Sequence, residues 1–194
     1  MGGIVSGCTF SDNVAKDSSG GGLYFSSRNG GVVDSIFINN AAVMRGGGLF
    51  IGINSTTINC TFRNNTANYG GGVGLYVGYL IGSIFINNTA SSSGGAVYSS
   101  DGKDGVLTDC IFSGNNAKSG GAIFWAINNG NIFNSIFINN TASSSGGAIF
   151  VYLQVNIINC SFANSKWVKS NGIYSNVKIN INGGCYFINF IKQC

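Results

Sequence analysis

Phenylalanine recurs through this 194-residue chain at a nearly constant interval. The gaps between successive members of the series are 27, 25, 23, 27, 25, 25 and 25 residues. The stretch SIFINNTASSSGGA also occurs twice without a change, at residues 83–96 and 135–148. A period of about 20–50 residues indicates a solenoid, in which each repeat contacts only its neighbours. The series consists of Phe10, Phe37, Phe62, Phe85, Phe112, Phe137, Phe162 and Phe187.

Composition decides between a helical and a β solenoid. The chain has 31 glycines, no proline and no histidine, and asparagine is abundant and often doubled. Glycine and asparagine disfavour helices, whereas the plentiful Val, Ile, Phe, Tyr and Thr favour strands. We therefore expect an all-β chain, a parallel β-helix that forms one domain over residues 1–194. It should have about eight coils of ~25 residues, stacked ~4.8 Å apart.

Two further positions repeat with each phenylalanine. Two residues before it stands Cys or Ser, and strand alternation places both residues on the inward face. Three residues after it stands Asn, which we expect at a corner, in left-handed backbone and hydrogen-bonded along its own stack. The asparagines are Asn13, Asn40, Asn65, Asn88, Asn115 and Asn140, and the cysteines are Cys8, Cys60, Cys110, Cys160 and Cys185.

Glycine pairs, from Gly21–Gly22 to Gly146–Gly147, precede an apolar run in each repeat. They predict a second corner, at which a side chain would crowd the bend. The distance from the second glycine to the next phenylalanine varies from 13 to 17 residues. The variable loop should lie in that interval.

The stretches FINNTASSSGGAVY and FSGNNAKSGGAIFW resemble the FxxN and GGA[ILV] motifs of the chlamydial polymorphic outer membrane protein repeat. They are also similar to repeats in adhesin-like surface proteins of methanogenic archaea. The resemblance runs from Cys8 to Phe187 and implies a right-handed β-helix and an extracellular or cell-surface location. The last two coils diverge, because Ser165 and Phe190 replace the corner Asn, and Trp167 and Lys192 replace an alanine.

The acidic residues are few and dispersed, and we expect no catalytic residue, metal or cofactor. Asp34 and Asp109 share a ladder position but lie three coils apart, ~14 Å by the strand spacing. Glycoside hydrolysis usually needs two carboxylates about 5–9.5 Å apart. Asp101 and Asp104 fall with Lys103 in the longest variable loop, which reads as a solvated turn.

The cysteines are expected to fill the core beside phenylalanine. Cys8, Cys60 and Cys110 should lie two coils apart, ~9.6 Å, which exceeds the ~7 Å limit for a disulfide. Cys160 and Cys185 occupy adjacent coils in a poor geometry for a disulfide, and Cys194 is free to pair between chains. Six N-x-[ST] sequons leave glycosylation open, at Asn54, Asn59, Asn64, Asn87, Asn139 and Asn159.

The net charge of +4 is scattered, so we expect no nucleic-acid partner. The apolar run 73–86 is broken by glycine and too short for a membrane helix, so we expect no membrane span. Met1 leads into Gly2 without a basic and apolar leader, which indicates a trimmed chain or one not secreted by that route.

Two functional hypotheses remain. The first is a non-enzymatic extracellular structural or adhesive β-helix. It is either the stalk of a surface adhesin or a subunit that stacks end to end into filaments, with Cys185 continuing the ladder onto Cys8 of the next chain. Glycans or another cell surface are possible partners. The alternative is a carbohydrate-binding or carbohydrate-active β-helix.

Overall fold

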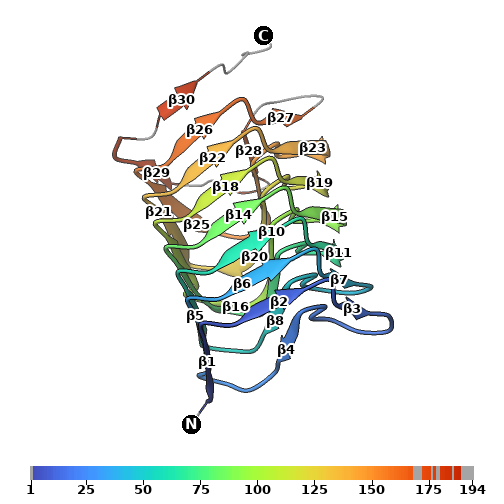
Figure 1. Ribbon diagram of the computed structural model, residues 1–194. Coiled ribbons are helices and arrows are strands. Elements are labelled where there is room, and N and C mark those ends of the chain that lie inside the picture. Colours follow the sequence, from blue (N-terminus) through green and yellow to red (C-terminus); the bar gives the residue numbers. More distant parts are fainter. Residues whose placement is uncertain (1, 168–171, 176, 178–179, 185, 189–194) are drawn as a thin grey trace.

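The computed structural model describes residues 2–167, 172–175, 177, 180–184 and 186–188 (Figure 1). Cys185, Phe190, Lys192 and Cys194 lie outside these residues, as do the side chains of Trp167 and Phe187. The described chain forms four parallel sheets, which wind around a common axis.

Each sheet takes one strand from each coil, and we name the sheets A to D in chain order. Sheet A contains β1 (Ile4–Ser6), β5 (Gly31–Val33), β9 (Ser55–Ile58), β13 (Gly78–Ile81), β17 (Val106–Thr108), β21 (Gly130–Phe133), β25 (Val155–Ile158) and β29 (Asn180–Asn182). Sheet B contains β2 (Thr9–Ser11), β6 (Ile36–Ile38), β10 (Thr61–Arg63), β14 (Ile84–Ile86), β18 (Ile111–Ser113), β22 (Ile136–Ile138), β26 (Ser161–Ala163) and β30 (Tyr186–Ile188).

Sheets C and D complete each turn. Sheet C contains β3 (Val14–Ala15), β7 (Ala41–Ala42), β11 (Thr66–Tyr69), β15 (Thr89–Ser93), β19 (Asn116–Ser119), β23 (Thr141–Ser145) and β27 (Lys166–Trp167). Sheet D contains β4 (Leu23–Phe25), β8 (Leu49–Ile51), β12 (Val73–Leu75), β16 (Val97–Lys103), β20 (Ile123–Asn128), β24 (Ile149–Val151) and β28 (Ile173–Ser175).

Every strand pair is parallel and joins equivalent residues of successive coils, such as Phe62 with Phe85. Seven coils have all four strands, and β29 and β30 belong to an eighth. The expected all-β parallel solenoid is confirmed. Within the described part of the chain, no helix is long and apolar enough to cross a membrane.

The phenylalanines of sheet B form a stack along the axis. Consecutive rings from Phe10 to Phe162 have centroids 4.8–4.9 Å apart and planes within 8° of parallel. The six rings from Phe37 to Phe162 are fully buried. The ring spacing equals the distance between hydrogen-bonded strands, so the backbone ladder itself sets the aromatic stack.

An asparagine ladder lies beside the phenylalanines, and its members from Asn40 to Asn140 are fully buried. The Asn88 side chain shows the pattern. Its Nδ2 donates to the carbonyl of Phe62 and to Oδ1 of Asn115, at 2.9 and 3.1 Å. Its Oδ1 accepts from both the backbone N–H and Nδ2 of Asn65, each at 3.0 Å. The side-chain amides from Asn40 to Asn115 therefore bond to both neighbouring coils.

The expectation that these asparagines adopt left-handed backbone is wrong. The positive φ belongs to the preceding residue, for example 56° at Asn39, 55° at Asn64 and 53° at Asn87. The preceding residue makes the bend and stays exposed. The ladder asparagine can then turn inward, where its amide reaches the neighbouring coils.

The glycine corner lies between sheets C and D and has three positions. The first glycine has positive φ, as in Gly70 at 62° and Gly94 at 66°. A Cβ at the second, Gly71, would lie 2.4 Å from the carbonyl oxygen of Gly95. The third position is Gly in the first three coils, Ala in the next three (Ala96, Ala122 and Ala148) and Gly172 in the seventh. The glycine pairs identified in the sequence are therefore positions two and three in the first three coils, but positions one and two in the next three.

We predict that Asn88→Ala destabilises the fold strongly, because it leaves the backbone N–H of Asn65 and the carbonyl of Phe62 without their side-chain partner in a dry interior. Each such group costs about 1–3 kcal/mol, so urea denaturation should show a loss of roughly 2–6 kcal/mol. The control is Asn87→Gly, which changes an exposed residue with positive φ. Equal losses in the two variants would contradict the ladder.

Candidate functional site

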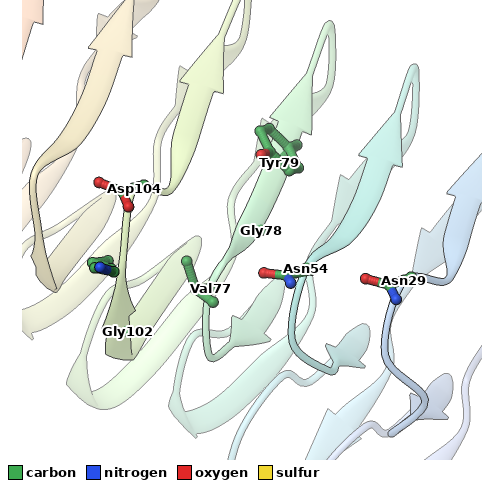
Figure 2. Close-up of a pocket in the computed structure, with 8 residues that line it drawn as sticks. Asn29, Asn54, Val77, Gly78, Tyr79, Gly102 and Asp104 are labelled. Carbon is green, nitrogen blue, oxygen red and sulfur yellow. The ribbon is translucent and has the colours of Figure 1, made fainter.

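A cleft of about 610 Å³ opens at the corner between sheets D and A. Figure 2 shows Asn29 and Asn54 following one another on successive coils, with Val77 and Asp104 on the next two. The cleft is lined by Asn29, Asn54, Val77, Gly78, Tyr79, Gly102, Lys103 and Asp104. An adjoining apolar hollow of about 330 Å³ shares Val77 and Gly102 and adds Ile53 and Tyr76.

Unequal connection lengths produce this cleft. Residues 76–78 alone separate Leu75 from Tyr79, whereas residues 100–105 separate Ser99 from Val106, although both pairs occupy equivalent register positions. The shortest connection therefore lies beside the longest. At this corner the backbone has positive φ at Asn29, Asn54 and Asp104 but not at Val77. The coil that contains Val77 therefore lacks the left-handed corner residue, and the hollow opens there.

The long connection is not the solvated turn expected from its sequence. Strand β16 continues to Lys103 and pairs Ser100 with Ala126 and Lys103 with Asn128 across a register shift. Residues 102–104 are nevertheless exposed. The insertion thus extends a strand past the corner and presents Lys103 and Asp104 at the edge of the cleft.

The polar side chains of the cleft have no internal partners. Asn29, Asn54, Lys103 and Asp104 are exposed, and none of their side chains bonds to another residue in the described part of the chain. At the corner between sheets B and C the exposed amides do pair, as in Asn39 Nδ2 to Asp12 Oδ1 at 3.0 Å. The cleft therefore presents hydrogen-bond donors and hydrogen-bond acceptors that are available to a ligand.

Sheet D carries a second aromatic ladder, on its outward face, which the sequence analysis missed. Its signal was an aromatic residue two or three places after every glycine corner except the one at Gly70–Gly72. Neighbouring rings lie 4.8–5.3 Å apart where they occupy adjacent coils, so most ring faces cover one another. The ladder consists of Tyr24, Phe50, Tyr98, Phe124, Phe150 and Tyr174.

Gly74 interrupts this ladder between Phe50 and Tyr98, and Arg45 fills the gap. A Cβ at Gly74 would lie 2.9 Å from the Cβ of Arg45. The guanidinium carbon of Arg45 lies 5.6 Å from the Tyr98 ring centroid and 5.7 Å from that of Tyr76. Cation–π attraction therefore holds the arginine where a ring is absent, next to the apolar hollow.

The cysteine positions are inward. Cys60, Cys110 and Cys160 are buried and Cys8 in the first coil is half-buried. The alternation with serine has a hydrogen-bonding reason, because the backbone N–H of Cys60 donates to Oγ of Ser83, which donates to a carbonyl in its own coil. Cys8, Cys60 and Cys110 form no disulfide.

Burial keeps the ladder thiols neutral. Loss of solvation raises the pKa of Cys60 to about 11 and that of Cys110 to about 12, with Asp34 and Asp109 adding smaller upward shifts. A neutral thiol is a poor nucleophile and a poor metal ligand. In the described residues no three His, Cys, Asp or Glu side chains gather closely enough to hold a metal ion.

We predict that stability falls as the pH rises above 9. Below that value the Cys110 thiol is neutral in the folded and unfolded chains, and between pH 9 and about 12 it ionises only in the unfolded chain. Urea unfolding at pH 8 and pH 10.5 should therefore show a smaller pH-dependent loss in Cys110→Ser than in the native chain. Equal losses would show that the thiol is not desolvated.

The chain is similar in sequence to one known protein family. A family model described as a right-handed beta helix region matches residues 2–166, which is most of the chain. Searches of curated proteins and of solved structures gave no match. The parallel coils, the stacked ladders and this match agree, and the chain belongs to the right-handed β-helix family.

Proposed function

We propose that this chain is a non-enzymatic structural or adhesive β-helix that works outside the cell or at its surface. The observation that carries the proposal is the in-register stack of seven complete coils, which repeats the same buried contacts throughout. The phenylalanine and asparagine ladders of the interior support the next coil, whereas the connections between sheets D and A differ in length from coil to coil. Such a solenoid is a scaffold that grows by adding coils.

The motifs support the surface location. The FxxN and GGA[ILV] patterns resemble those of chlamydial polymorphic outer membrane proteins and of adhesin-like proteins of methanogenic archaea. The spacing of the carboxylates supports a non-enzymatic role. Asp34 and Asp109 lie on the same corner but three coils apart, ~14 Å by the strand spacing, which is beyond the range for paired acid and base in glycoside hydrolysis.

The edge strands of the first coil support the self-assembling form of the proposal. Its strands β1, β2, β3 and β4 each pair with a neighbour on one side only. The Asn40 Oδ1 accepts two N–H groups from Asn13, but the Oδ1 of Asn13 has no donor among the described residues. A further β-helical coil would supply both donors. In the filament form of the proposal, a second copy provides this coil.

Negative-stain electron microscopy and light scattering over a range of protein concentrations test this proposal. Filaments that lengthen with concentration would support the self-assembling form, and a dispersed monomer at high concentration would contradict it and leave the stalk. Fusing a β-helical capping coil before Gly2 should block the filaments, or raise the unfolding temperature of the monomer. Reducing ends released from a polysaccharide panel, at a rate that Asp104→Asn abolishes, would contradict the non-enzymatic role.

A further inference from the structure

The cleft has the size and the two-sided character of a small-molecule site. Its volume of about 610 Å³ lies within the range of roughly 300–1,000 Å³ for ligand pockets. Ile53, Tyr76 and Val77 form the apolar part, and the unpartnered amides of Asn29 and Asn54 lie on the polar side. A matching ligand carries many hydrogen-bonding groups together with apolar C–H faces.

Tyr79 supplies an aromatic surface at the cleft. It points outward from β13, is 43% exposed and stacks on no other ring in the described part of the chain. The rings of the outer ladder, by contrast, cover each other at 4.8–5.3 Å and expose mainly their edges. Tyrosine combines an apolar face with a polar tip, so Tyr79 suits a ring-shaped ligand with hydroxyl groups.

Charge and backbone pairing narrow the ligand class. Lys103 and Asp104 bring opposite charges to the same edge, so the cleft has no excess of either sign to select a polyanion or a cation. The backbone N–H groups beside it are already used between coils, as in Thr56 to Gly30 and Asn131 to Gly105, both 2.9 Å. An extended peptide therefore finds no strand edge to pair with.

We propose that this cleft binds a neutral carbohydrate, with one sugar ring against Tyr79 and its hydroxyl groups bonded to the Asn54 amide and the Asp104 carboxylate. The proposal rests on the adhesive form of the proposed function and names its ligand class. The corner residues Asn54 and Asp104 are separated by one coil that lacks their counterpart. The two groups are therefore ~9.6 Å apart by the strand spacing, and both line the cleft.

The test uses the 194-residue chain made in a host without N-glycosylation, because Asn54 begins a sequon. An array of neutral hexose and N-acetylhexosamine oligosaccharides, with sialylated and uronate oligosaccharides beside them, is probed first. The strongest neutral binder is then titrated by NMR. Tyr79→Ala and Asn54→Gly should each weaken binding by about tenfold or more, whereas Tyr79→Phe should retain most of it.

Tyr152→Ala is the matched control, since Tyr152 is 53% exposed and lies outside the cleft; it should leave the affinity unchanged. Absence of binding to every neutral oligosaccharide at millimolar concentration would overturn the proposal. So would a preference for acidic oligosaccharides that Lys103→Ala removes, or equal affinity in Tyr79→Ala. Cleavage of the bound sugar would instead refute the non-enzymatic role and leave the site in place.

Discussion

Hydrogen bonding between successive coils is the interaction on which the whole solenoid depends. It places each residue directly above its equivalent, one strand spacing away, as the ring separations of 4.8–4.9 Å from Phe10 to Phe162 show. A position inside the solenoid is therefore defined by its own copies in the two neighbouring coils. A residue type that stacks well on itself is favoured at every turn, which explains why the sequence repeats.

The asparagine ladder shows how a polar interior satisfies this constraint. A buried amide without partners costs free energy, but the amides from Asn40 to Asn115 find theirs in the coils on either side. Cysteine and serine alternate at the neighbouring ladder position, where the serine Oγ accepts a hydrogen bond from the backbone N–H of the cysteine in the preceding coil. Function is thereby confined to the outer surface and to the connections, where residues need not repeat.

Much of the fold could be predicted from the sequence, because periodicity identifies residues that stack. Strand alternation places Phe85 and Ser83 on the same face of the strand, and in a β-helix this face points into the core. The left-handed residue was assigned one place too late, since both Asn87 and Asn88 are asparagines and only their burial distinguishes them. The cleft was missed although its signal was present, in the repeat gap of 23 residues followed by one of 27. A change in repeat length shows which connection is shorter. It does not show that Asn54 and Asp104 line the same cleft as Tyr79, because that depends on the course of the backbone through the connections.

The central claim is that register between coils, and not any one segment, holds the fold. The duplicated stretch allows a direct measurement, because deletion of residues 83–134 removes two whole coils and rejoins the chain at an identical sequence. We expect both the native chain and this shortened chain to unfold cooperatively in urea. A matched deletion of residues 83–121 ends within a coil and should give a chain with no cooperative transition. Cooperative unfolding of both, or of neither, would contradict the account.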